Sequence, residues 1–206
     1  MKLTDKTVTG LLEAFRSSDP TPGGGSASAL AGAIGASLLA MVAGLPKPRA
    51  ASEEDLARLR AAGARCATLA EQLTTLVDRD SAAYDAVLAA YRLPKDTTEE
   101  KAARSERIQE AVRTAIAVPL EVMRASHTAI EQAVVVAEFG NRNASSDVQV
   151  GLELLGAALR GAQLNVEINL GSVKDADYES RIRSDVGDLL GASDRETEAA
   201  RAYLSA

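Results

Sequence analysis

The fold is decided by residues 22–45, which read PGGGSASALAGAIGASLLAMVAGL. From Ser26 to Leu45 there is no charged residue, and the larger apolar side chains recur at steps of about four. This period predicts a helix. Gly32 and Gly35 each cost about 1 kcal/mol relative to alanine inside a helix. We therefore infer that another helix, or a ligand, packs very close to this one.

A membrane-spanning helix is the competing interpretation of the same stretch, because twenty apolar residues can cross a bilayer. Half of residues 26–45 are Ala or Gly and three are Ser, so their hydropathy is weak. A helix that is apolar on all sides is also what the centre of a helical bundle requires. We expect a buried central helix and no association with a membrane.

Helical periodicity also covers the segments on either side of this stretch. Prolines 20 and 22 end the first helix, Ser52 is placed to cap the third, and Gly140 follows the fourth. The sequence predicts an all-α fold, a single domain over 1–206. It is a multihelical bundle of about six helices around a central Ala/Gly-rich helix, and the helices flanking the central one are expected at 4–17, 52–91, 98–139, 147–171 and 177–204.

Composition excludes several classes of protein. The net charge of −6 argues against a nucleic-acid-binding protein, which would carry a basic face. The single cysteine, Cys66, forms no internal disulfide and the N-terminus has no apolar run, so a cytoplasmic location is expected. The single histidine, His127, gives no metal-ligating cluster, so no metal site is expected.

The glycine turn at the start of the central helix is the first candidate binding feature. Gly23, Gly24 and Gly25 allow a ligand to approach their backbone N–H groups, and Ser26 follows directly. A helix N-terminus favours an anion or a polarised carbonyl. The turn lacks the Gly-Lys-Ser/Thr ending of a P-loop and follows no strand, so by itself it favours the interpretation of a simple turn.

Carboxylates interrupt the apolar stripe of the long helix over 52–91. Asp80 and Tyr84 are four residues apart and therefore share a face. The segment is either a solvated face or a site at which Asp80 points inward. An inward carboxylate would have a raised pKa, which suits a general acid or base.

Asparagines form two further clusters. Asn165 and Asn169 are four apart in a helix, although asparagine is a poor helix former, and buried amides need partners from another helix or from a polar heterocycle. Asn141 and Asn143 precede Asp147, which begins the next helix. This loop serves either as a helix cap with dipole compensation or as part of a site.

Together these motifs resemble the formiminotransferase-cyclodeaminase family. The resemblance includes TPGGGS at 21–26, DSAAYDAV at 80–87, YRLPK at 91–95, GNRN at 140–143 and NVEIN at 165–169, in order along nearly the whole chain. It implies an all-helical homodimer that needs neither a metal nor a cofactor. It also implies a crevice that binds a tetrahydrofolate derivative.

The resemblance also implies roles for individual residues. Asp80 is expected to be the main catalytic carboxylate, with Asp147 in support, and Lys95 is a candidate for binding the folate tail. The remaining substrate-binding residues that the resemblance implies are Gly23, Gly24, Gly25, Ser26, Tyr84, Asn141, Asn143, Asn165 and Asn169.

Three functions follow as alternatives. The first is a cyclohydrolase that converts 5,10-methenyltetrahydrofolate to 10-formyltetrahydrofolate. The second is cyclodeamination of 5-formiminotetrahydrofolate with release of ammonia. The third is a helical interaction protein that has kept the fold without the chemistry. The loop over 44–51 favours the third, because it lacks the polar Asn and Thr and most of the lysines typical of the family.

Overall fold

The computed structural model describes residues 2–205, and within this range it contains helices and no strands. The all-α prediction is confirmed. The elements in chain order are η1 (Leu3–Asp5), α1 (Val8–Arg16), α2 (Gly24–Ala43), α3 (Glu53–Tyr91), α4 (Thr98–Phe139), η2 (Arg142–Ala144), α5 (Ser145–Leu170) and α6 (Ala176–Ser205).

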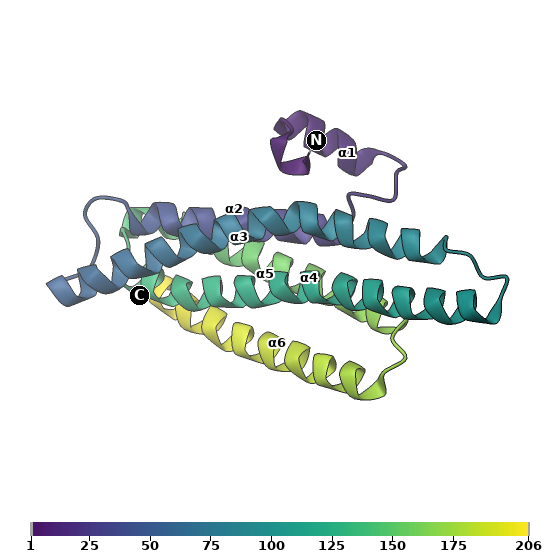
Figure 1. The fold of residues 1–206 in the computed structure, drawn as a ribbon. Helices are drawn as coiled ribbons and strands as arrows, with labels where there is room; N and C mark the ends of the chain where they lie inside the picture. The colour runs from purple at the N-terminus through teal and green to yellow at the C-terminus, as the bar shows by residue number, and fades with distance from the viewer. Residues whose placement is uncertain (1, 206) are drawn as a thin grey trace.

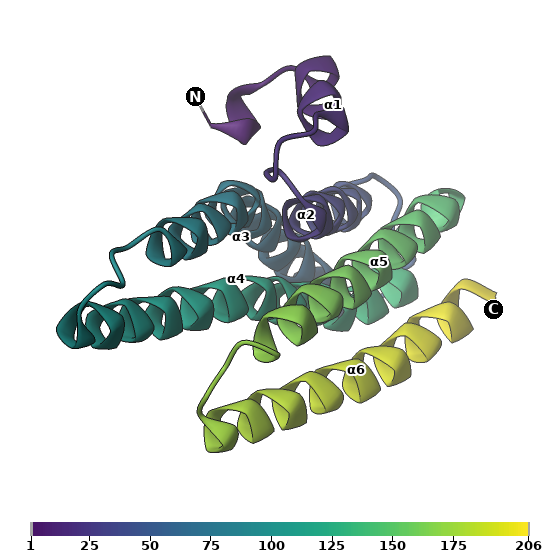
Figure 2. The ribbon, with the colours of Figure 1, turned by 90° about the vertical axis from the view of Figure 1, so that its right-hand side faces the viewer.

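Helix α2 is packed against α3, α4 and α5, and α6 covers α4 and α5 from the other side (Figures 1 and 2). Although α2 is long and apolar enough to cross a bilayer, more than half of it is buried inside the bundle. Its glycines explain how three helices approach it. A Cβ at Gly32 would lie 3.2 Å from atoms of Leu73, Ser126 and Ala158, which belong to three different helices. The expectation of close packing around this helix is confirmed.

Helices α3 and α4 form the long antiparallel pair that supports the rest of the bundle (Figure 1). Ser52 caps α3 by accepting a hydrogen bond from the Asp55 amide, as the sequence predicted. Thr97 and Glu100 form a reciprocal capping box at the start of α4. These caps fix where the two longest helices begin.

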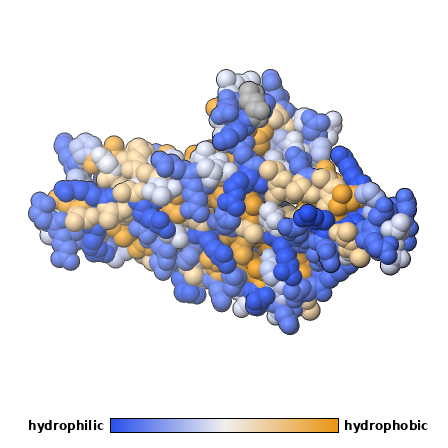
Figure 3. Space-filling view, viewed as in Figure 1, coloured by the Kyte–Doolittle hydropathy of each residue, from blue (hydrophilic) through white to orange (hydrophobic). Residues whose placement is uncertain are grey.

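Helix α1 stands apart from the bundle and forms a separate projection on the surface (Figures 1 and 3). The prediction of one helix over 4–17 is wrong at its start. Residues 3–5 form a short 3-10 turn, and Thr7 then caps a helix that begins at Val8. The Asp78 carboxylate ties the turn to α3 by accepting from the Leu3 amide and the Thr4 hydroxyl.

Candidate active site

A cavity of about 370 Å³ lies at the N-terminal end of α2, where α3, α4 and the C-terminal end of α5 meet it. Its wall combines backbone from the glycine turn with polar side chains from α3 and α5, and α4 contributes an alanine. The residues that line it are Pro20, Thr21, Gly23, Gly24, Gly25, Asp80, Tyr84, Ala115, Asn165, Ile168, Asn169 and Ser172.

The Asp80 carboxylate is held against the first turn of α2. Ser26 Oγ lies 2.9 Å from Asp80 Oδ2, and it also lies 2.9 Å from the Val77 carbonyl oxygen. Ser26 is fully buried, so its hydroxyl is confined to these partners and to Ser81 Oγ at 3.1 Å. A Cβ at Gly25 would lie 2.7 Å from Asp80 Oδ2 and would overlap the rest of the carboxylate. Glycine at this position therefore allows the carboxylate to reach the helix N-terminus.

The surroundings of Asp80 act on its pKa in opposite directions. Burial raises the pKa of the Asp80 carboxyl, because removal from water disfavours its charged form. Hydrogen bonds from the Ser26 side chain and backbone lower it and offset part of that effect. The net result is a carboxyl whose pKa is above its ordinary value, which is the property expected of a general acid or base.

The two asparagines of α5 are oriented by helix carbonyls. Pro119 has no N–H, so it cannot donate to the Ala115 carbonyl four residues before it. Asn169 Nδ2, on α5, donates to the Ala115 carbonyl instead, at 3.0 Å, and it also donates to the Asn165 carbonyl at 2.9 Å. Asn165 Nδ2 donates to the Gly161 carbonyl at 2.8 Å. Since carbonyls only accept, these bonds fix the amides with their nitrogens on the helices and leave each Oδ1 available as an acceptor.

Tyr84 lies one helical turn beyond Asp80 and contributes to the cavity wall, with 42 % of its surface exposed. It shares a face of α3 with Asp80, as the spacing predicted. Its aromatic ring gives the entrance of the cavity an apolar surface beside the polar groups of α5.

Four of the residues proposed from the sequence lie elsewhere. Asn141 Nδ2 donates to the Pro46 carbonyl at 2.7 Å, and Asn141 Oδ1 accepts from the Asn143 amide at 2.9 Å. This loop and Asp147, in the first turn of α5, lie beside the C-terminal end of α2. The length of α2 separates them from the cavity by about 30 Å. Lys95 is exposed between α3 and α4 and does not line the cavity.

The structure also places residues in the cavity that the sequence did not single out. They are Pro20, Thr21, Ala115, Ile168 and Ser172. One signal in the sequence pointed towards Ala115: a proline inside a helix releases the carbonyl four residues earlier. The other residues carry no comparable signal, because each lies at the cavity only through the packing of the helices.

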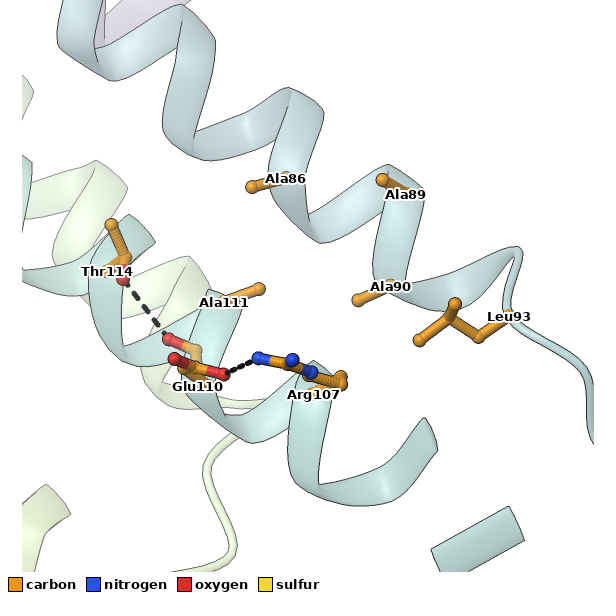
Figure 4. Close-up of a pocket in the computed structure, with 8 residues that line it drawn as sticks. All are labelled: Ala86, Ala89, Ala90, Leu93, Arg107, Glu110, Ala111 and Thr114. Carbon is orange, nitrogen blue, oxygen red and sulfur yellow. Dashed lines mark hydrogen bonds and ion pairs between the residues drawn. The ribbon is translucent and has the colours of Figure 1, made fainter. Parts of the chain in front are cut away.

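A second cavity, of about 400 Å³, lies between the facing ends of α3 and α4 (Figure 4). Alanines and Leu93 form most of its wall. Arg107 and Glu110 pair with each other at 2.8 Å, so their charges are already compensated. The Thr114 hydroxyl, the remaining polar side-chain group in its wall, donates to the Glu110 carbonyl at 3.2 Å. We therefore assign the chemistry to the cavity that contains Asp80.

Comparison with known proteins shows which family the chain belongs to. The family model described as formiminotransferase-cyclodeaminase matches residues 7–188. The chain belongs to the formiminotransferase-cyclodeaminase family. It is 41 % identical over 189 residues to a protein named methenyltetrahydrofolate cyclohydrolase from Methylorubrum extorquens, covering 91 % of each chain.

Two further relatives differ from this chain in length or in identity. The formimidoyltransferase-cyclodeaminase of Sus scrofa is 34 % identical over 96 % of this chain, but the match covers only 36 % of the pig protein. The crystal structure of a formiminotetrahydrofolate cyclodeaminase from Thermotoga maritima superposes with a TM-score of 0.87 at 22 % identity, covering 99 % of this chain and 98 % of that one. At this level of identity the likeness confirms the fold.

Proposed function

We propose that this protein is a methenyltetrahydrofolate cyclohydrolase that converts 5,10-methenyltetrahydrofolate to 10-formyltetrahydrofolate. The observation that carries the proposal is the Asp80 carboxylate, which has a raised pKa and faces a cavity beside Asn165 and Asn169. The identity of 41 % to a cyclohydrolase over 91 % of both chains supports the same reaction.

The reaction requires one group that moves a proton twice. Water adds to the cationic carbon between N5 and N10, and Asp80 takes one of its protons. The same carboxyl then protonates N5 as the bond from carbon to N5 breaks, and the remaining hydroxyl proton leaves as the formyl C=O forms. A carboxyl with a pKa nearer neutrality serves both steps better than an ordinary aspartate. The carboxylate also stabilises the cationic bridge.

The asparagines provide the complementary part of the site. Their Oδ1 atoms are hydrogen-bond acceptors on one wall of the cavity, so they suit the N–H groups of a reduced pterin. The N-terminal amides of α2 are donors on the facing wall. Donors on one wall and acceptors on the other fit a flat heterocycle that carries both kinds of group along its edge.

Formiminotetrahydrofolate cyclodeamination is the second candidate, favoured by the identity of 34 % to the pig formimidoyltransferase-cyclodeaminase over 96 % of this chain. Absorbance of the methenyl group distinguishes the two reactions. Purified protein should bleach methenyltetrahydrofolate if it is a cyclohydrolase, whereas a cyclodeaminase would generate the same chromophore from the formimino substrate. If neither change occurs and calorimetry detects no tetrahydrofolate binding, the chain is a non-catalytic helical protein.

We further propose that the protein is a homodimer that assembles through α2 and α5. Both helices expose large apolar side chains on the surface of the bundle: Ile34 and Met41 on α2, and Val150, Leu164 and Ile168 on α5. A step of seven residues on α2, and steps of fourteen and four on α5, place them along one stripe of each helix. Contiguous exposed apolar surface of this kind is typical of an interface between subunits.

A dimer of this kind would also explain why the predicted site residues lie in two groups. Helices α2 and α5 run antiparallel, because Asn165 on α5 lies beside the start of α2, whereas α5 itself begins beside the end of α2. A two-fold axis through the middle of the stripe would bring the start of the partner's α5 towards the cavity. Asn143 and Asp147 would then contribute to the cavity of the opposite subunit.

A further inference from the structure

The wall of the cavity continues beyond Tyr84 towards the outer ends of α3 and α4. Asp80, Tyr84 and Tyr91 are spaced by four and seven residues, so they share one face of α3. Ala115, Ile108 and Arg104 are spaced by seven and four residues, so they share one face of α4. The two faces meet, since the Arg104 guanidinium lies over the Tyr91 ring at 5.5 Å. From Asp80 to Tyr91 this surface extends about 16 Å along the helix.

Two cations lie level with the far end of this surface, Arg104 on the face of α4 that meets α3 and Lys174 on the neighbouring face of α4. Arg104 donates from Nε and Nη2 to the Tyr91 carbonyl, at 3.3 and 2.9 Å, and Lys174 Nζ lies 2.8 Å from Ser105 Oγ. Since Ser105 follows Arg104 directly, both cations lie at the same level of α4. Among residues 2–205, neither has a carboxylate within ion-pairing distance. Each therefore keeps its charge available to a ligand.

The segment that carries Lys174 is fixed in place beside the cavity. Gln109 on α4 donates from Nε2 to the Ser172 carbonyl at 3.0 Å and accepts from the Lys174 amide at 2.9 Å. Ser172 itself lines the cavity that contains Asp80. Arg113 neutralises the neighbouring Asp175 at 2.8 Å. Residues 172–174 thus connect the wall of the cavity to the Lys174 cation, and the carboxylate of Asp175 is already paired with Arg113.

We propose that this surface binds the aminobenzoyl-glutamate part of the substrate, with Arg104 and Lys174 binding its carboxylates. This inference rests on the proposed function, because it assumes that the reacting carbon of a folate lies at Asp80. The aromatic ring then lies along Tyr84 and Tyr91, which are 42 % and 47 % exposed. On α4, the apolar Ile108 lies on the same face as Ala115 and Arg104, between them. The site favours anionic tails and distinguishes folates from tail-less pteridines.

The geometry favours these two cations over Lys95. Lys95 lies beyond the end of α3 in an exposed connection, and no hydrogen bond or ion pair among the described residues orients its side chain. Arg104 and Lys174 each have a hydrogen bond that positions the charged group. A positioned cation loses less side-chain entropy when a carboxylate binds.

The test compares substrates that differ only in the tail. KM and kcat are measured for the 5,10-methenyl derivatives of tetrahydropteroate, which has no glutamate, and of the mono- and triglutamate forms. Arg104→Met and Lys174→Met should each raise KM for the glutamate-bearing substrates by about fivefold to tenfold, the size expected for a partly exposed charge-assisted hydrogen bond. KM for the pteroate substrate and all three kcat values should stay within about twofold.

Two control variants and a binding measurement make the result decisive. Lys95→Met and Arg107→Met remove nearby cations outside the proposed tail site and should leave all three KM values unchanged. Equal KM changes for the pteroate and glutamate substrates, or no change at all, would overturn the proposal. If the wild-type protein hydrolyses none of the three, the proposed function fails. Binding of p-aminobenzoylglutamate by calorimetry then tests the tail site alone, and binding that is absent, or unaffected by Arg104→Met and Lys174→Met, refutes it.

Discussion

The position of the Asp80 carboxylate depends on the glycine at position 25. From the sequence alone, the triple-glycine stretch favoured a simple turn, and Asp80 was equally compatible with a solvated face. In the structure the missing Cβ of Gly25 provides the space that the Asp80 carboxylate occupies. Residues 55 positions apart in the chain become one unit, and no spacing rule in the sequence links them. Their individual identities were predictable from the motifs, whereas their contact depended on how α3 packs on α2.

Asp80→Asn should abolish turnover while stabilising the fold. The amide keeps the shape of the side chain but cannot take a proton from water, so kcat should fall by at least about a hundredfold.

The same substitution should affect stability. In the wild type, burial of the ionised carboxylate lowers the free energy of unfolding, and this loss is present above the raised folded-state pKa. The variant should therefore unfold at a higher temperature at neutral pH. The advantage should disappear as the pH falls below about 3.9, where the carboxyl is protonated in both states. Thermal unfolding at pH 7 and pH 3.5 measures this, and an unchanged kcat would exclude Asp80 as the proton carrier.

The pH dependence of the reaction should report the balance between burial and the Ser26 hydrogen bond. Since the first step needs ionised Asp80, kcat/KM should fall on the acid side with an apparent pKa above the usual value of about 3.9. Ser26→Ala removes a donor that lowers this pKa, so the acid limb should move to higher pH. Steady-state rates across the acid range provide the profile. An acid limb that moves to lower pH in Ser26→Ala would contradict this account.

At the scale of elements, the helices were largely predictable because capping and periodicity are local. The predicted ranges 52–91 and 98–139 agree closely with α3 (Glu53–Tyr91) and α4 (Thr98–Phe139), and α5 and α6 agree within one or two residues at each end. The contacts between helices were not predictable. The hydrogen bond from Asn169 to the Ala115 carbonyl joins α5 to α4. Only the structure reveals that Asn169 donates to the carbonyl that Pro119 leaves without a backbone donor.

This link between helices should appear in a double-mutant cycle. Asn169→Ala leaves the Ala115 carbonyl without a donor and should lower the free energy of unfolding by about 1–3 kcal/mol. Pro119→Ala restores a backbone N–H to the same carbonyl. The two changes together should therefore cost less than their sum, with a coupling of about 1 kcal/mol. Urea denaturation of the four proteins gives the cycle, and strict additivity would show that the two side chains act independently.

The glycines of α2 and α6 should respond to alanine in opposite ways. A Cβ at Gly35 would lie 2.8 Å from the Gly151 carbonyl oxygen of α5, so Gly35→Ala forces the helices apart and should cost about 1–3 kcal/mol. A Cβ at Gly187 in α6 would meet nothing within 4 Å, so Gly187→Ala should stabilise the protein by about 0.5–1 kcal/mol. Urea denaturation measures both. Equal effects at the two positions would mean that helix propensity, rather than close packing, governs α2.

At the scale of the whole molecule, the site predicted from the sequence is divided within one chain. Most of its residues lie at the cavity, three lie at the opposite end of α2, and Lys95 lies apart from both. Eight of the predicted residues lie at or against the cavity: Gly23, Gly24, Gly25, Ser26, Asp80, Tyr84, Asn165 and Asn169. Asn141, Asn143 and Asp147 lie at the opposite end of α2. A sequence motif indicates that its residues act in the same site, but it does not indicate which subunit contributes each residue. Two antiparallel helices with exposed apolar stripes offer a way to bring the groups together.

Subunit complementation should test this arrangement. Asp80→Ala and Asp147→Ala should each be inactive alone if every cavity takes Asp80 from one subunit and Asp147 from the other. In a mixed dimer, one of the two cavities would contain both native residues. After exchange in an equal mixture, half of the dimers are mixed, so about a quarter of the wild-type activity should return.

The control for complementation pairs two variants of the same cavity. Asp80→Ala mixed with Asn165→Ala should regain no activity, because in each cavity both residues come from the same subunit.

Val150→Lys and Leu164→Lys place charges on the apolar stripe of α5 and should shift the protein towards monomers in sedimentation, with loss of activity at low concentration. A fully active monomer would place the whole reaction within one chain. Asn141 and Asn143 would then act only on the connections beside α2 and α5, where their hydrogen bonds lie within this chain, and Asp147 only on the first turn of α5.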